Sequence, residues 1–190
     1  PNSITYHPYK ELLVELTKHK FDYYKRTTLI PLNKVNSWSY NNGNISHNTN
    51  KYFSVIGVRV TAEKREVSFW DQPIIKQEYS GTSGFLKKII NGSSHVLVHY
   101  KMECGFIDSF EVAPTVQCVA ENYFADKLPV YYKYFIDENN YFKIFDTYQS
   151  EEGGRFYQES NRNIIMLVDS SFPVDAVSYT HLTLPTKRIV

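Results

Sequence analysis

The chain has 190 residues, of which 42% are hydrophobic and 16% aromatic, and its formal net charge is +1. This length suits one well-buried domain, and the apolar content excludes a disordered chain. The near-neutral charge, with no basic block, argues against a nucleic-acid partner, and no apolar run approaches the roughly 20 residues that a membrane span requires.

The elements of the N-terminal half follow from periodicity and turn residues. Tyr9–Lys20 has leucines at helical spacing and predicts a helix. Asn41–Asn44 has the asparagines and glycine of a tight turn. Tyr52–Val60 and Arg65–Gln72 are rich in strand-forming residues and predict a hairpin. Pro73 is expected to end the second strand, because proline has no N–H to donate to a ladder.

In the second half, Phe85–Ile90 is predicted as one or two helical turns. Asn91-Gly92 is a tight-turn signal that leads into a central strand at Ser94–Gly105. Glu111–Cys118 is expected to return beside it, as an edge or bulged strand because of Pro114. Two further strands are predicted at Tyr141–Tyr148 and Asn163–Asp169. These elements together predict an α+β fold that is mainly β.

The two ends and the cysteines give weaker signals. The segment 177–182 reads VSYTHL, which one reading frame of a transposase sequencing-adaptor end would encode. We therefore expect native sequence over 1–176 and a non-native tail over 177–190, with a real C-terminal strand as the alternative. Cys104 and Cys118 are too few for a disulfide framework. Reduced thiols in a cytoplasmic protein are the default, and a bridge between neighbouring strands stays open.

The predicted strand Ser94–Gly105 has two unlike faces, because side chains of a strand alternate. One face is apolar and suits a packed core: Val96, Val98, Tyr100 and Met102. The other carries ionisable groups beside a single leucine: His95, His99, Lys101 and Glu103, with Leu97. Four ionisable side chains on one face suit neither an ordinary surface nor a sealed core, so a polar cleft is the economical explanation.

Each of these groups also has a structural reading. His95 and His99 would stand about 13 Å apart on a strand, which excludes a shared metal ion. Either histidine alone is as compatible with a core position as with catalysis. Lys101 and Glu103 are within reach of each other and fit either an ion pair at a sheet rim or an acid–base pair in a cleft.

A second polar run lies at Ser150–Phe156, where two adjacent glutamates precede two glycines and Arg155. Such a run could bring backbone N–H groups and a guanidinium to an anionic ligand, and a solvated turn is the alternative. The sequence contains no phosphate-binding glycine loop, nucleophile elbow or HExxH motif, and the acidic Nudix box is missing.

Several separated motifs resemble the NDP-hexose 2,3-dehydratase family. The first is the element at Trp70–Ile75, which resembles WxQPII. The others are Ile45–His47, Tyr52–Val55, His95–Val98, Lys101–Gly105, Pro114–Gln117 and Gln149–Gly153. Cys104 departs from the family pattern, which usually has proline after the glutamate.

This resemblance implies a fold, an assembly and an activity. Members are cytosolic enzymes of deoxysugar pathways with two tandem Nudix-like repeats that lack the Nudix box, and they form homodimers. The chain is therefore expected to be one Nudix-like repeat, with a mixed or antiparallel sheet and a few short helices, in a fragment of a longer protein. The substrate implied is a dTDP-sugar, dTDP-4-keto-6-deoxyglucose.

The implied reaction needs neither a metal nor a redox cofactor. The C4 carbonyl acidifies the C3 hydrogen, a base removes it, and an acid assists loss of the C2 hydroxyl. We expect Glu103 or His99 to be the base, and Lys101 to polarise the ketone or assist the leaving hydroxyl. The residues expected to bind substrate are Trp70, Gln72, His95, Gln117, Gln149 and Arg155. The alternative function is a non-catalytic repeat that binds nucleotide sugar or builds the dimer.

Overall fold

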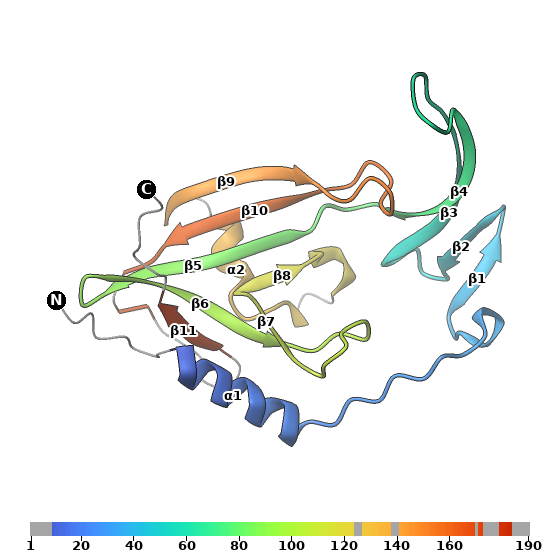
Figure 1. The fold of residues 1–190 in the computed structure, drawn as a ribbon. Coiled ribbons are helices and arrows are strands. Elements are labelled where there is room, and N and C mark those ends of the chain that lie inside the picture. The colour runs from blue at the N-terminus through green and yellow to red at the C-terminus, as the bar shows by residue number, and fades with distance from the viewer. Residues whose placement is uncertain (1–8, 124–126, 138–140, 170, 173–178, 184–190) are drawn as a thin grey trace.

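The structure is a computed structural model that describes residues 9–123, 127–137, 141–169, 171–172 and 179–183 (Figure 1). It is an α+β fold that is mainly β, as the sequence predicts. The helices are α1 (Tyr9–Asp22) and α2 (Tyr132–Ile136), with short 3-10 turns at Leu32–Lys34 and Ala120–Asn122. No helix in this described part of the chain is long and apolar enough to cross a membrane.

The strands form two sheets. The smaller sheet is antiparallel, in the order β1-β2-β3-β4. Its strands are β1 (Trp38–Asn41), β2 (Asn44–His47), β3 (Phe53–Thr61) and β4 (Phe69–Gln77). The larger sheet has the order β11-β6-β5-β10-β9, with β7 and β8 paired to β6 and β5. Its strands are β5 (Thr82–Ile90), β6 (Ser93–Lys101), β7 (Glu111–Pro114), β8 (Val116–Cys118), β9 (Phe142–Ser150), β10 (Ser160–Leu167) and β11 (Tyr179–Thr183). Its β5–β10 pair is parallel, so of the two predicted sheet types the larger sheet is mixed and the smaller one is antiparallel.

Two hairpins have the turn chemistry that the sequence predicts. Asn42 and Gly43 connect β1 to β2 with φ of 51° and 83°, and Asn91 and Gly92 connect β5 to β6 with φ of 50° and 79°. Positive φ at both central residues is what a two-residue hairpin of type I′ requires. The turns therefore fix both strand registers locally.

Two sequence predictions about strands are wrong. Pro73 does not end β4, which continues to Gln77. The N–H of Ile75 donates to the Arg155 carbonyl, outside the sheet, so the proline two residues earlier also faces outward and removes no ladder bond. Phe85–Ile90 is not helical, because it forms most of β5, the central strand of the larger sheet.

The larger sheet buries both of its faces, and β6 shows how. Val96, Val98 and Tyr100 pack with Leu12 of α1 in one cluster. Leu97 points the other way into a second cluster that contains Phe135 of α2. The two helices thus cover opposite faces of the sheet. Met102, predicted in the core, lies beyond the end of β6 and is 38% exposed.

The β5–β6 pair opens beyond the Leu86–Leu97 register, and β7 and β8 enter the opening. Thr115 lies at this branch point and is 1% exposed. Its hydroxyl accepts a hydrogen bond from the Leu86 N–H at 3.0 Å and donates one to the Leu97 carbonyl. It therefore satisfies two buried backbone groups that the parting strands would leave unpaired. The irregularity predicted at Pro114 is the place where the chain passes from β7, which pairs with β6, to β8, which pairs with β5.

The segment 179–183 is β11, which pairs with His95–His99 of β6. The remainder of the 177–190 segment lies outside the described residues. Its assignment to an adaptor, and that of 1–176 to one repeat, stay predictions about the gene.

Candidate active site

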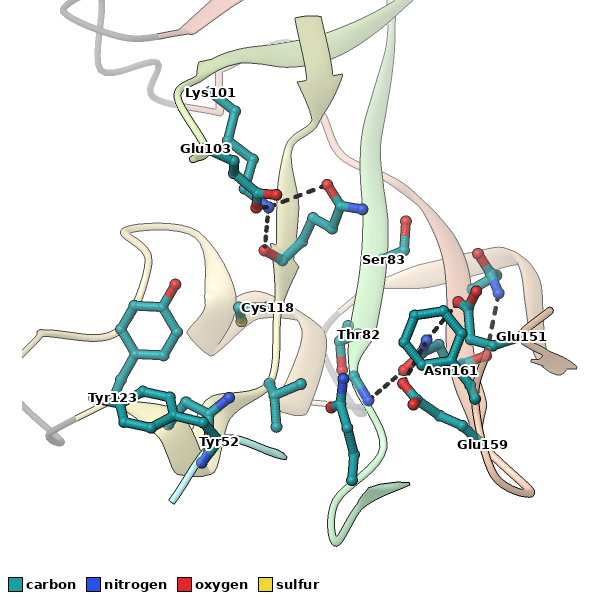
Figure 2. Close-up of a pocket in the computed structure, with 17 residues that line it drawn as sticks. Tyr52, Thr82, Ser83, Lys101, Glu103, Cys118, Tyr123, Glu151, Glu159 and Asn161 are labelled. Atoms are coloured by element: carbon teal, nitrogen blue, oxygen red, sulfur yellow. Dashed lines mark hydrogen bonds and ion pairs between the residues drawn. The ribbon is translucent and has the colours of Figure 1, made fainter. Parts of the chain in front are cut away.

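A polar cavity of about 830 Å³ lies where β5 and β6 part (Figure 2). Its volume is in the range of ligand pockets. A polar row crosses three strands at its base, since Ser83 of β5 registers with Gln117 of β8 on one side and Asn163 of β10 on the other. Predicting that row requires strand registers, which the sequence alone does not supply.

Lys101 and Glu103 line one side of the cavity, as the sequence reasoning predicts, although β6 ends at Lys101. Their ammonium and carboxylate form an ion pair, with the lysine side chain 18% exposed and the glutamate side chain 47% exposed. Lys101 Nζ also donates to the side-chain and backbone oxygens of Gln117, at 3.2 and 3.4 Å. Three predicted site residues are therefore brought together here.

The segment that follows α1 anchors the loop that carries Glu103. Lys25 Nζ donates to three carbonyl oxygens of this loop, those of Glu103 at 3.0 Å, Phe106 at 2.7 Å and Asp108 at 2.9 Å. A half-buried ammonium with three carbonyl acceptors is well satisfied and fixes the path of the loop. Lys25 is a supporting residue that sequence reasoning missed, because nothing local marks this contact.

The opposite wall comes from β10 and the loop between β9 and β10. Figure 2 shows Glu151, Glu159 and Asn161 on the far side of β5 from Lys101 and Glu103. Asn161 Nδ2 lies 2.6 Å from Glu151 Oε1 and 3.5 Å from Glu159 Oε1. Burial and the nearby charge of Glu151 raise the pKa of Glu159, against an opposing effect of the Asn161 hydrogen bond. Glu159 and Asn161 were also missed from the sequence.

Aromatic rings and a thiol complete the lining. Tyr52, Tyr123 and Phe156 all border the cavity. Tyr52 has a φ of 71°, unusual for a bulky residue, and its N–H donates to Asn122 Oδ1 at 2.9 Å. Burial raises the pKa of the Cys118 thiol to about 11, so this thiol is neutral at physiological pH.

The WxQPII-like element lies outside the cavity and contacts the β9–β10 loop, which forms part of the wall opposite Lys101 and Glu103. Trp70 Nε1 donates to Gln72 Oε1 at 2.7 Å, and Gln72 Nε2 donates to the Gly154 carbonyl at 3.0 Å. Ile75 exchanges backbone hydrogen bonds with Arg155 and Tyr157, both at 2.8 Å. Neither Trp70 nor Gln72 borders the cavity, and their contacts instead dock the β9–β10 loop onto β4.

Four other predicted site residues are not among those that line the cavity. His95 is fully buried, with Nδ1 3.0 Å from the Ser93 carbonyl oxygen. His99 is half-buried, and burial, with a smaller effect of Lys101, lowers its pKa. Gln149 is exposed on β9. Arg155 forms an exposed ion pair with Glu152 at 2.9 Å.

The fold and this cavity define a mainly β protein with a charged pocket of ligand size. A family model described as NDP-hexose 2,3-dehydratase matches residues 10–186, so the chain belongs to the NDP-hexose 2,3-dehydratase family.

Three curated relatives are each named dTDP-4-dehydro-6-deoxy-alpha-D-glucopyranose 2,3-dehydratase. The one from Streptomyces violaceoruber is 37% identical over 182 residues, covering 94% of this chain and 41% of the relative. The one from Saccharopolyspora spinosa is 38% identical over 156 residues, covering 80% and 32%. The one from Amycolatopsis orientalis is 32% identical over 164 residues, covering 85% and 35%. The chain thus spans at most about two fifths of their length.

Proposed function

We propose that the full-length protein removes the C2 hydroxyl of dTDP-4-keto-6-deoxyglucose, and that the cavity described above is where the sugar reacts. The observation that carries this proposal is the Lys101–Glu103 pair, a base and a proton donor on the wall of a ligand-sized cavity. The family membership and the names of the three relatives support the choice of substrate.

The chemistry follows from the substrate. Abstraction of the C3 proton gives a carbanion that the C4 carbonyl delocalises as an enolate. Glu103 is the base, preferred over His99 because it borders the cavity. Lys101 donates to the C4 oxygen, where negative charge develops, and such stabilisation of an oxyanion is often the largest electrostatic contribution to catalysis. Tyr52 and Tyr123, in place of Trp70, offer aromatic faces for a nucleobase.

The test is to incubate the full-length protein with dTDP-4-keto-6-deoxyglucose and to follow loss of the C2 hydroxyl. Glu103→Gln and Lys101→Met are each expected to lower kcat by about 10²–10⁴-fold. Lys76 and Glu78 are a matched control, because they form an ion pair with the same residue types and spacing outside this cavity. Lys76→Met and Glu78→Gln should keep wild-type turnover. Wild-type turnover of both Glu103→Gln and Lys101→Met would refute the assignment.

One observation favours a second function, a repeat that binds nucleotide sugar or builds a dimer without chemistry of its own. Lys101 is already bonded to both Glu103 and Gln117, as in a purely structural ion pair. Isothermal titration of dTDP against the Glu103→Gln variant would discriminate. Binding together with unchanged turnover would favour the non-catalytic repeat.

The proposal includes the larger assembly. Residues 1–176 would be one of two Nudix-like repeats in a homodimer, which is in keeping with the share of its relatives that the chain spans. A cytoplasmic location is in keeping with Cys104 and Cys118, which are free thiols. Sedimentation of the full-length protein would test the dimer.

A further inference from the structure

The wall opposite Lys101 and Glu103 has a carboxyl oxygen that lacks a hydrogen-bond donor. Glu159 borders the cavity, and its Oε2 is buried with no hydrogen-bond partner among the described residues. A buried carboxylate oxygen without a donor carries a substantial desolvation penalty. Protonation of the carboxyl or contact with a ligand would relieve that penalty.

The surrounding contacts explain why Glu159 has no strong donor. The Gly81 N–H donates to Asn161 Oδ1 at 2.6 Å, which turns the Asn161 amide nitrogen toward the two glutamates. That nitrogen donates to Glu151 at 2.6 Å and lies 3.5 Å from Glu159, so the strong hydrogen bond goes to Glu151. A Cβ at position 81 would lie 2.6 Å from Asn161 Oδ1, so a side chain there would displace this amide.

The same geometry keeps two carboxyl groups side by side. The Glu151 N–H donates to the Glu159 carbonyl at 3.0 Å, and both side chains meet at Asn161. Two neighbouring carboxyl groups disfavour ionisation of both, and the one without a strong donor holds its proton more tightly. The raised pKa of Glu159 agrees with this assignment.

We propose that Glu159 is a second catalytic residue of this cavity and donates the proton to the departing C2 hydroxyl. This inference rests on the proposed function, and it separates the acid from the base: Glu103 acts on C3 from one wall, and Glu159 acts on the C2 oxygen from the other. A carboxyl group that holds its proton more tightly than an ordinary carboxyl is suited to this step.

The step balances without an oxidant or a reductant. The C3–H bond breaks, its proton goes to Glu103, and its electron pair is held in the enolate. That pair forms the C2–C3 double bond as the C2–O bond breaks, and the departing oxygen takes the proton of Glu159 and leaves as water. Glu159 becomes a carboxylate, and transfer of a proton from Glu103 through solvent restores both groups.

The test uses Glu159→Gln in the full-length protein, because glutamine has the same shape and cannot act as the acid. In D₂O we expect dehydration to fall by about 10²–10⁴-fold while the C3 hydrogen still exchanges for deuterium, followed by NMR. Glu103→Gln should instead lose the exchange. Glu152→Gln is the matched control, since Glu152 lies in the same loop, exposed and paired with Arg155 outside the cavity.

Each possible result either supports or refutes the role of Glu159. If wild-type protein neither exchanges C3 nor dehydrates the sugar, the proposed function fails, and with it the role of Glu159. If wild-type protein dehydrates and Glu159→Gln does so equally well, only the role of Glu159 is wrong. Loss of both exchange and dehydration, or of dTDP binding, would also overturn it, because an isosteric change at a proton donor leaves these intact. Glu159→Asp, which keeps a carboxyl group, should dehydrate faster than Glu159→Gln.

Discussion

Gly84→Ala tests how tightly α2 is packed on the larger sheet. A Cβ at Gly84 would lie 2.8 Å from both Cδ1 and Cζ of the Phe135 ring, and nearer still to Cε1. Phe135 is 1% exposed and is enclosed by Leu86, Val116 and Ile164, so its ring has no room to retreat. Overpacking of a core by one methyl group costs about 1–3 kcal/mol. At about 2–4 °C per kcal/mol, the thermal midpoint should fall by roughly 2–12 °C.

Gly57→Ala is the matched control, because Gly57 is also a strand glycine and has nothing within 4 Å of its Cβ position. It should change the free energy of unfolding by less than about 0.5 kcal/mol. Thermal unfolding of the full-length variants, followed by circular dichroism, measures both. In a Phe135→Leu background, Gly84→Ala should cost less than in wild type, because the clashing atoms are gone. Equal midpoints for the two alanine variants, or full additivity with Phe135→Leu, would refute the packing explanation.

Three further changes test other parts of the fold. Thr115→Val removes the hydroxyl that bonds two buried backbone groups, and it should lower the free energy of unfolding in urea by about 2–4 kcal/mol. Thr115→Ser loses only one methyl group and should cost about 1 kcal/mol. Equal losses for the two variants would contradict this. Lys25→Met should speed amide exchange in the loop after β6 and lower kcat, while Lys18→Met, at an exposed position of α1, should do neither. Asp146→Asn breaks a bidentate pair with Arg162, at 2.8 and 2.6 Å. Because this pair lowers the pKa of Asp146, its stabilisation is present above the unfolded value of about 4 and is lost as pH falls through the lower folded value. The thermal deficit of Asp146→Asn should therefore shrink in acid, and a deficit that is constant with pH would count against the pair.

Local signals in the sequence predict much of the fold. The alternation of Val96, Leu97 and Val98 predicts a strand, and two Asn-Gly pairs predict hairpin turns at the right places. The strand Phe85–Ile90 was missed because it follows a glycine-rich run and contains Lys87 and Lys88. It is a strand because β6 and β10 pair with it on either side, which is tertiary information.

The site was predicted only where its residues share a segment or an adjacent strand. Lys101 and Glu103 are two residues apart, and Gln117 lies in β8, the second part of the predicted return strand, which pairs with β5. Glu159 and Lys25 reach the site through contacts with residues about 80 positions away, as in the Gly81–Asn161 and Lys25–Glu103 bonds. A single sequence has no local pattern that marks such contacts.

The branch point at Thr115 has a consequence for how the site can change. The end of β6 leads to one wall of the cavity, and β5 pairs with β10 of the other wall; β5 and β6 part at one buried hydrogen-bonded position, and not at a loop tip. Insertions or substitutions in the surrounding loops would therefore alter access and selectivity while leaving the span between the walls intact. Members of the family are expected to differ more at the rim of the cavity than at the position where β5 and β6 part.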